Sequence, residues 1–493
     1  MTVIRILFAA VFVWFVCLSS GNLLFRALRL KFPRRERIFL AFLSGAALVS
    51  TVMFLLAAFT LVYTGVLLII GFAVVSAWVY FCRPDFRNPR GLGPNLPWLW
   101  QIAFWAPLLI YGCLYLLTAL APETDPAGTT YRVGLITRYY GHHGFFPIYT
   151  NMYAGLAEGI EMLFWIAFSL GRHSAAAIVE MLFLSAMPFG MLSFGERIGM
   201  PRAGVAGALL FYLAPIVGKD GTIAYVDVAT AAVVFATFYI LQIWIDETSG
   251  RNGNRLLLST GLLAGFGFAC KITASTAVVY TVAFVLIVAV KRKGWGPGLR
   301  AVFVVTSSAC VISLPWVLKN LIQFPNPFFP LFNHWFPNPY QYPMVEDRLR
   351  HDMARFNGVA YSQIPFELTV GGHLVGTIGP IFLLAPLALL SLRFRSGRHL
   401  LTAFVAMSLP YFSNTAARFF IPALPFLAMA LAIALVRISK VGPTLAFVAV
   451  VFHSWSSWPG VNCYRTLGTR ISMAHRPDRR PCRPQNHSGE PVS

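Results

Sequence analysis

The chain has 493 residues, of which 57% are hydrophobic and only 12% are charged, and its mean hydropathy is +0.67. Soluble proteins carry about twice that share of charged residues, so the composition excludes an ordinary soluble protein and predicts one that crosses a membrane many times. A net charge of +21 would suggest a nucleic-acid partner in a soluble chain. Here the basic residues lie in short segments between apolar runs, as they do in membrane proteins, which argues against nucleic acid.

Fourteen apolar runs predict helices, although several are shorter than the ~20 residues that cross ~30 Å of hydrocarbon. The first run begins after Arg5 and is similar to a signal peptide, but no small-residue cleavage site follows it, so we expect a retained anchor. The fold class expected is an all-α polytopic protein with about 11–14 spans. The runs cover residues 6–25, 38–60, 64–82, 97–121, 174–194, 203–217, 228–245, 256–270, 272–290, 301–318, 374–392, 400–412, 419–436 and 444–456.

Basic residues are distributed unevenly between alternate loops. The loops that include 26–37, 83–96 and 291–300 carry 22 Lys and Arg against five acids in total, whereas the opposite set carries 10 against ten. Because cytoplasmic loops are enriched in Lys and Arg, we expect the first set to face the cytoplasm and the second set to face the exterior. The tail after Trp455 departs from this alternation.

Two exterior loops, 122–173 and 319–373, are long enough to be functional or separately folded. We divide the chain into amino-terminal helices (1–96), a membrane core that contains both loops (97–456) and a polar, disordered tail (457–493). Within the first loop, residues 160–170 are apolar but short, which favours a helix lying along the membrane surface. The second loop is rich in Pro, Asn and aromatic residues, which suggests a rigid, aromatic-lined cover.

Carboxylates on the exterior side are the candidate chemical groups, because they could take a proton from an acceptor hydroxyl or amine, or hold a divalent cation. Glu158 and Glu161 could instead form the solvated face of a surface helix, and Asp227 could simply favour a helix amino terminus. Glu180, the one acid inside a span, faces a cavity or is protonated and silent. The candidate acids in these segments are Asp125, Glu158, Glu161, Glu180, Asp220 and Asp227.

Two basic residues stand near these acids in the predicted topology. Lys271 interrupts an otherwise continuous apolar stretch from 256 to 290, and Arg418 begins a later run, both on the exterior side. Either could bind a phosphate, or could reach out to the membrane surface without a specific partner. The seven Cys show no CxxC or Cys/His spacing, and His142 and His143 fit a surface pair, so no metal site is expected.

In chain order, these features resemble the GT-C superfamily of membrane glycosyltransferases, which includes protein O-mannosyltransferases and the bacterial lipid A aminoarabinose transferase. The resemblance covers most of residues 100–440. It is carried by segments that are individually weak but share one order and one side of the membrane: PETDPAGTTYR, GLAEGIEMLFWIAFSLG, TIAYVDVA, GLLAGFGFACK, LPWVLKNLIQFPNPFFP and ARFFIPALP.

The resemblance implies transfer of a sugar from a polyprenyl-phosphate carrier to a lipid, glycan or protein acceptor, at the exterior face of a bacterial inner membrane. It implies Asp125 as catalytic base, Asp227 and Glu161 as supporting acids, and Lys271 and Arg418 as phosphate ligands. Tyr131 and Arg138 complete the expected substrate-binding set, and no cofactor is identified, a divalent cation being one candidate. The expected site residues are therefore Asp125, Asp227, Glu161, Lys271, Arg418, Tyr131 and Arg138.

The first loop departs from the family pattern, which often reads Asp-Ala-x-x-Tyr-His. Ala127 stands where the acid is expected before Tyr131, Asp125 lies two residues earlier, and Arg132 replaces the His. Such a shift leaves open a displaced base or an altered activity, including a scaffold descended from an enzyme. The other alternative is a secondary transporter or lipid-carrier flippase, although the sequence shows no internal repeat and its charges gather at one membrane face.

Overall fold

The computed structural model describes residues 2–82, 93–123, 125–126, 128–247 and 250–458. All regular structure in these residues is helical, and each of the fourteen apolar runs overlaps at least one helix, although run 203–217 is divided between two helices and the helix of run 374–392 begins only at Pro380. Eight helices are long and apolar enough to cross a membrane, so the chain is an integral membrane protein. They are α1 (Thr2–Ala27), α2 (Arg34–Ala58), α3 (Thr64–Cys82), α4 (Trp98–Leu120), α7 (His173–Arg197), α10 (Asp227–Asp246), α12 (Ser275–Lys293) and α13 (Trp295–Gln323).

The remaining helices are shorter or more polar, as several of the apolar runs predicted. In the bundle they are α8 (Pro201–Tyr212), α11 (Gly250–Cys270), the 3-10 helix η7 (Pro380–Arg393), α16 (Arg395–Ser408), α17 (Leu424–Arg437) and α18 (Gly442–Ser456). In the loops they include α5 (Val133–His142), α6 (Gly159–Gly171), α9 (Pro215–Asp220), η3 (Ile272–Ala274), α14 (Pro343–Ala354), α15 (Ile364–Phe366) and η9 (Ala417–Phe420).

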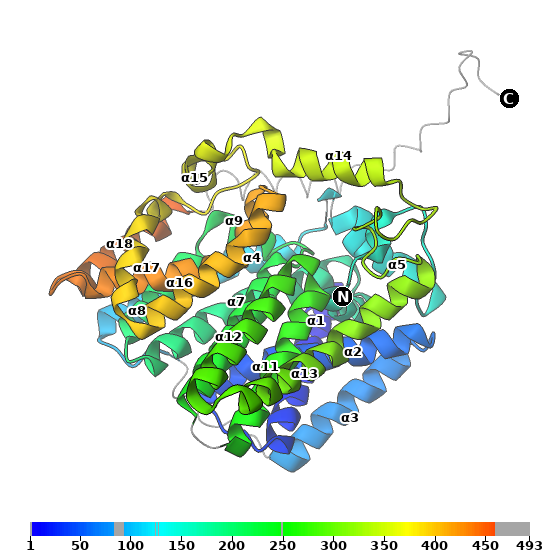
Figure 1. Cartoon of the computed structure of the whole chain (residues 1–493), viewed down its shortest axis with the longest axis horizontal. Helices are drawn as coiled ribbons and strands as arrows, with labels where there is room; N and C mark the ends of the chain where they lie inside the picture. Colours follow the sequence, from blue (N-terminus) through cyan, green and yellow to red (C-terminus); the bar gives the residue numbers. More distant parts are fainter. Residues whose placement is uncertain (1, 83–92, 124, 127, 248–249, 459–493) are drawn as a thin grey trace.

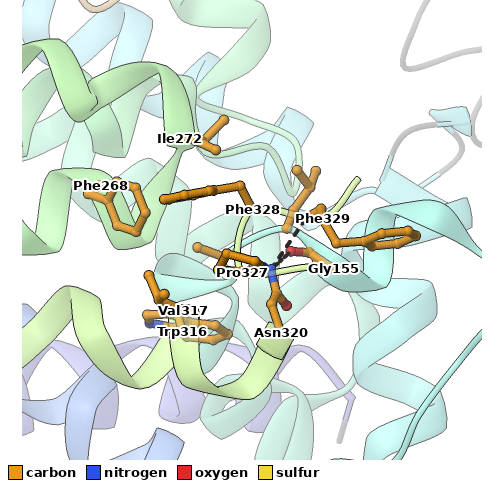
Figure 2. Close-up of a pocket in the computed structure, with 11 residues that line it drawn as sticks. Gly155, Phe268, Ile272, Trp316, Val317, Asn320, Pro327, Phe328 and Phe329 are labelled. Atoms are coloured by element: carbon orange, nitrogen blue, oxygen red, sulfur yellow. Dashed lines mark hydrogen bonds between the residues drawn. The ribbon is translucent and has the colours of Figure 1, made fainter. Parts of the chain in front are cut away.

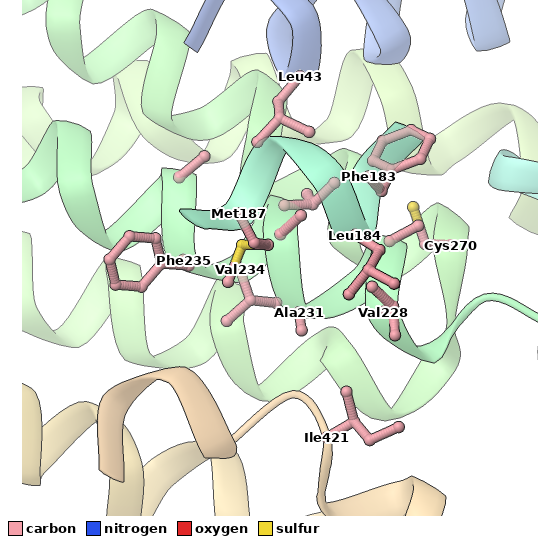
Figure 3. Packing of buried hydrophobic residues seen from close by; sticks show 14 of the residues in the cluster. Leu43, Phe183, Leu184, Met187, Val228, Ala231, Val234, Phe235, Cys270 and Ile421 are labelled. Carbon is pink, nitrogen blue, oxygen red and sulfur yellow. The ribbon is translucent and has the colours of Figure 1, made fainter. Parts of the chain in front are cut away.

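Helix α10 is the centre of the bundle. Its apolar stretch is wholly buried, whereas only 17% of the corresponding stretch of α3 is buried. Figure 3 shows Val234 and Phe235 of α10 close to Met187 of α7, with Leu43 of α2 on the far side of that layer. Asp227, the first residue of α10, is itself only 2% exposed. The amino end of α10 is therefore held inside the protein.

The two sets of loops gather at opposite ends of the helices. At one end the Val62 amide donates to the His143 carbonyl (3.0 Å), and the Thr415 amide donates to the Met353 carbonyl (3.1 Å). The basic loops meet at the other end, where Arg35 pairs with Glu196 at 2.6 Å. Helix α14 lies across the first end, above α11, α12 and α13, which run side by side (Figure 1). Both long loops thus belong to one end of the bundle.

The short apolar helix of the first loop is not a surface helix. Helix α6 packs against α1, α2 and α7, and residues such as Met162, Leu163 and Trp165 have no exposed surface. The prediction of a helix lying on the membrane was wrong because a short apolar segment fits a buried core position as well as an interfacial one. The predicted disordered tail, from residue 459 onward, lies outside the described residues.

Helices α1 and α2 approach each other closely because each presents a glycine at their contact. A Cβ atom at Gly45 would overlap the backbone of Cys17, and one at Gly21 would overlap the backbone of Ala41. Small residues allow such close approach in membrane helix pairs, where dispersion contacts drive the packing.

We therefore expect Gly45→Ala to destabilise the protein by about 1–3 kcal/mol, since the added methyl must push the two helices apart. Thermal melting of the detergent-purified protein would measure this loss. Gly65→Ala is the matched control, because nothing lies within 4 Å of a Cβ atom there. Equal melting temperatures for wild type and both variants would contradict the close α1–α2 contact.

Candidate functional site

The site begins at the buried amino end of α10, where backbone N–H groups have no partner within the helix. Asp227 is the first helical residue. The amide of Val228 donates to the Asp220 carboxylate (3.2 Å), and the amide of Ala229 donates to the Glu180 carboxylate (2.8 Å). Three carboxylates thus surround one helix terminus, whose partial positive charge favours them. The interior location of Glu180 is explained by this capping contact.

Lys271 compensates part of this negative charge. It lies between α11 and η3, and its ammonium forms an ion pair with Asp227. The ammonium also lies 3.6 Å from the centre of the Phe419 ring, a cation–π contact. Both side chains of the pair are largely buried, with 11% and 3% exposure. Lys271 therefore does not extend to the membrane surface, and Asp227 does more than begin a helix.

Arg418 brings a second cation to the same place. Its guanidinium carbon lies 4.6 Å from the Tyr225 ring centre and 5.1 Å from that of Phe419. Burial acts to lower the pKa of Arg418, but nearby acidic groups, with Asp227 foremost and Tyr131, Tyr225 and Asp220 after it, together raise the pKa above the usual value. The Phe419 ring is shared by Lys271 and Arg418, so the two predicted phosphate ligands lie beside one aromatic side chain.

Asp125 joins this cluster through Tyr225. The Tyr225 hydroxyl donates to the Asp125 carboxylate, while the Tyr225 ring faces Arg418. Glu123 fixes the same region by accepting hydrogen bonds from the amides of Asp125 and Ala224, each at 2.9 Å. The first exterior loop is therefore tied to the turn before α10, although about a hundred residues separate them in sequence.

Asp220, on the same turn, is buried, and one of its carboxylate oxygens has no hydrogen-bond partner among the described residues. Burial, and next the charge of Asp227, raise the pKa of Asp220 well above its usual range. A carboxyl group in this environment binds a proton more tightly than an exposed one does. Asp220 thus limits how much negative charge accumulates at the end of α10.

Glu161 and Glu158 form a second pair of buried acids at the start of α6. Glu161 pairs with Arg132, and Glu158 lies 3.8 Å from the ammonium of Lys319 on α13. Both acids are buried, with 2% and 4% exposure, so the alternative of a solvated helix face was wrong. Arg132, which replaces the His of the family pattern, is thereby assigned a partner.

Tyr131 and Arg138 have different surroundings. Tyr131 stacks on Tyr153 with 4.3 Å between ring centres, beside the Arg132 guanidinium. Arg138 is exposed on α5 and donates a long hydrogen bond to Thr150 (3.4 Å), so the structure does not place it among the ion pairs of the cluster. Its helix turns it away from the buried face that carries Ile136 and Tyr139.

Three residues of this site were not among the predicted ones. Glu123 and Tyr225 link the two acid-bearing segments, and Lys319 contacts Glu158. Lys319 belongs to the segment LPWVLKNLIQFPNPFFP, where it is a charged residue next to an apolar run. Such a charge usually indicates a functional or paired side chain, so Lys319 could have been predicted. Glu123 and Tyr225 carried no such signal, because their contacts depend on two distant segments meeting.

A small apolar pocket of about 20 Å³, with room for little more than a water molecule, lies beside the cluster (Figure 2). Its lining includes Ile272, next to Lys271, and Asn320, next to Lys319. The Asn320 side chain donates to the Gly155 carbonyl at 2.6 Å, so the polar part of the wall is already paired. The other walls come from Phe268 of α11, Trp316 and Val317 of α13, and Pro327, Phe328 and Phe329.

A metal ion does not fit the residues present. In the part of the chain that the structure describes, no three His, Cys, Asp or Glu side chains converge as a metal site would need. The acids instead face cations and backbone amides, as shown by Asp227 with Lys271 and Glu161 with Arg132. The chemistry of the site is therefore derived from these side chains alone.

Comparisons with known proteins agree with the architecture. Residues 227–361 match a family model described as a domain of unknown function (DUF8201), and no curated protein matches the chain. Among solved structures, ArnT from Cupriavidus metallidurans bound to undecaprenyl phosphate is similar, with a TM-score of 0.50 and 15% identity over 76% of this chain. The apo state of the same ArnT gives a TM-score of 0.48 and 17% identity, over 69% of this chain and 60% of that one.

The chain spans 63% of the length of the lipid-bound ArnT chain. At this level of identity the likeness concerns the fold. The expected all-α, polytopic architecture is thereby confirmed, and its fold is similar to that of ArnT.

We expect Lys271→Met to destabilise the protein by about 3–5 kcal/mol, because it leaves the Asp227 carboxylate buried without its cation. Thermal melting of purified protein measures the effect. The double variant Lys271→Met, Asp227→Asn should recover much of the loss, since it removes both charges together. A single variant as stable as wild type would show that the pair is not buried as described.

Glu158 predicts a pH dependence of stability. Burial raises its pKa from 4.5 to about 7 in the folded protein, against the opposing charge of Lys319. Folding therefore favours the protonated acid, so its contribution is complete below pH 4.5 and is lost as the pH rises through about 7. The loss amounts to at most about 3 kcal/mol. Melting curves across this range should show a steeper decline for wild type than for Glu158→Gln; parallel declines would contradict the assignment.

Proposed function

We propose that this chain is a GT-C-type membrane glycosyltransferase that moves a sugar from a polyprenyl-phosphate carrier to an extracytoplasmic acceptor. One observation carries the proposal: Asp125, Asp227, Lys271 and Arg418 form one contact chain through Tyr225 and Phe419, at the membrane boundary beside an apolar pocket. The fold it shares with ArnT, solved with undecaprenyl phosphate bound, supports the same class of donor.

The two cations are suited to the phosphate of such a donor. Lys271 keeps ammonium donors beyond the one it gives to Asp227, and Arg418 offers several N–H groups from a planar fork. Charge developing on a departing phosphate would be stabilised by these groups in a site with little water. The apolar side chains next to Ile272 would contact the isoprenoid chain of the carrier. The donor's two parts thus have separate surroundings.

Asp125 is the proposed general base. In an inverting transfer, the acceptor oxygen or nitrogen bonds to the anomeric carbon, its proton passes to Asp125, and the bond from that carbon to the phosphate oxygen breaks. Polyprenyl phosphate then leaves, held by Lys271 and Arg418. The hydrogen bond from the Tyr225 hydroxyl holds the Asp125 carboxylate in position for this step. Asp227 acts by keeping Lys271 in position, and Glu161 does the same for Arg132.

Localisation follows from the topology. The exterior assignment of the acid-rich loops, with the positive-inside rule, supports an active site on the periplasmic side of a bacterial inner membrane. Partners would be the lipid-linked sugar, a lipid, glycan or protein acceptor, and membrane lipids. A transporter is less well supported because the buried ion pairs of the site, Lys271 with Asp227 and Arg132 with Glu161, lie at one end of the bundle rather than midway along it.

The test is transfer from radiolabelled polyprenyl-phosphate sugars in membranes, comparing wild type with Asp125→Asn. We expect the variant to lose at least a hundredfold in rate, as removal of a general base does, while still binding undecaprenyl phosphate. Unchanged transfer would reject Asp125 as the base. Unmodified substrate crossing sealed vesicles without transfer would instead support the transporter.

A binding measurement tests the phosphate site separately. Arg418→Gln should weaken the affinity for undecaprenyl phosphate by roughly tenfold or more, since a charged hydrogen bond of about 1.5–3 kcal/mol is lost. Arg138→Gln is the matched control, because that guanidinium is exposed and pairs with Thr150. Equal affinities for the two variants would remove Arg418 from the phosphate site.

A further inference from the structure

Residues 324–345 form a segment, which we name the aromatic loop, that buries two of its Asn side chains and exposes several large apolar ones; Phe324 and Phe329 are buried, and His334 is exposed beside Asp347. Asn326 and Asn333 have no exposed surface. Trp335, Tyr342 and Met344 are instead 79%, 75% and 78% exposed. This is the reverse of what water-facing loops show, because apolar surface left in water is unfavourable.

Buried hydrogen bonds make the aromatic loop rigid. The carboxylate of Glu346, the fourth residue of α14, accepts from the amides of Phe332 (3.0 Å) and Asn333 (2.9 Å) and from the Asn333 side chain (2.8 Å). Asn326 donates to the Leu331 carbonyl at 2.8 Å, and Asn338 donates to the Asn333 side chain at 2.7 Å. The exposed rings are therefore held outward by the interior of the loop, not by chance mobility.

The exposed rings are continuous with surfaces that already face lipid or the pocket. The ring centre of Phe332 lies 5.7 Å from that of Phe328, which lines the apolar pocket, and 6.2 Å from that of Trp335. The loop follows directly on α13, a candidate span whose last turns expose Leu318 and Ile322, the latter by 82%. The exposed apolar face of this span thus leads to the aromatic loop, while Lys319 and Asn320 of the same turns are buried.

Charge distinguishes lipid from a soluble partner. Residues 324–345, which include the first three residues of α14, contain no Asp, Glu, Lys or Arg. The rest of α14 carries Asp347, Arg348 and Asp352 in exposed positions. A charge-free segment rich in Trp, Tyr and Pro at the end of a span is typical of the membrane–water boundary, where amphipathic rings are most stable. The change to exposed charges at α14 indicates where water begins.

We propose that the aromatic loop is an interfacial anchor, which inserts Phe332, Trp335, Tyr342 and Met344 among the lipid headgroups beside the site. Its occupant is the bilayer itself, in the leaflet that borders α13. Anchoring here would hold the open side of the apolar pocket at headgroup depth. The inference does not depend on the proposed function, since it concerns only how the chain sits in the membrane.

The test places an environment-sensitive fluorophore on Trp335→Cys and, as a matched control, on Arg348→Cys. Arg348 lies on α14 with 85% of its side chain exposed. Cys82, Cys113 and Cys310, together with the two cysteines after residue 458, are first changed to Ala, while the buried Cys17 and Cys270 are kept. The labelled full-length protein is reconstituted into vesicles of phosphatidylethanolamine and phosphatidylglycerol.

We expect spin-labelled lipids to quench the label at position 335. Aqueous iodide should quench this label several-fold less than it quenches the label at position 348. Equal iodide quenching at the two positions would overturn the proposal. So would shielding from iodide without quenching by lipid, because that result identifies a protein or glycan contact instead.

A second measurement needs no substitution. Hydroxyl radicals generated in water should oxidise Met344 of the wild-type protein several-fold more slowly in these vesicles than in a short-chain detergent. The other residues of α14 should react equally in both. Equal oxidation of Met344 in vesicles and detergent would count against insertion, even if the labelled variants failed to fold.

Discussion

The structure depends on the need to stabilise a helix terminus inside the protein. The fully buried α10 brings its unpaired amides to the interior, where water cannot satisfy them. The carboxylates of Asp220 and Glu180 accept hydrogen bonds from two of these amides. Lys271 forms an ion pair with Asp227, which belongs to the same helix turn. Each acid that accepts a hydrogen bond from the helix amides adds negative charge, and this charge stabilises a cation placed nearby. An electrically mixed site in an apolar protein follows from this one constraint.

The same arrangement concentrates reactive groups at one membrane boundary. Tyr225 joins Asp125 to Arg418, and Phe419 lies against both cations. Ion pairs inside a protein are strong but costly to desolvate, so they persist where several partners compensate them together. This gives the cations fixed positions before any ligand arrives, which is the arrangement a phosphate-binding site requires.

Much of the helical architecture could be predicted because it depends on composition over ~20 residues at a time, which lipid selects directly. Residues 228–245 gave α10, and residues 272–290 gave α12. The environment of a short segment could not be predicted in this way. Residues 160–170 were assigned to the membrane surface but pack among α1, α2 and α7, because apolar character states only that water is avoided, not which neighbour replaces it.

The sequence by itself determined that the chain is helical, spans a membrane and carries its acid-rich loops on one side, since hydropathy and charge act locally along the chain. It also nominated Asp125, Asp227, Lys271 and Arg418 as candidates. Only the tertiary structure decided that these four meet, that Arg138 lies apart, and that Glu123 and Tyr225 join their segments. The reason is that ion pairs and hydrogen bonds act over a few ångströms in space, and spacing along a chain does not encode which distant residues come that close.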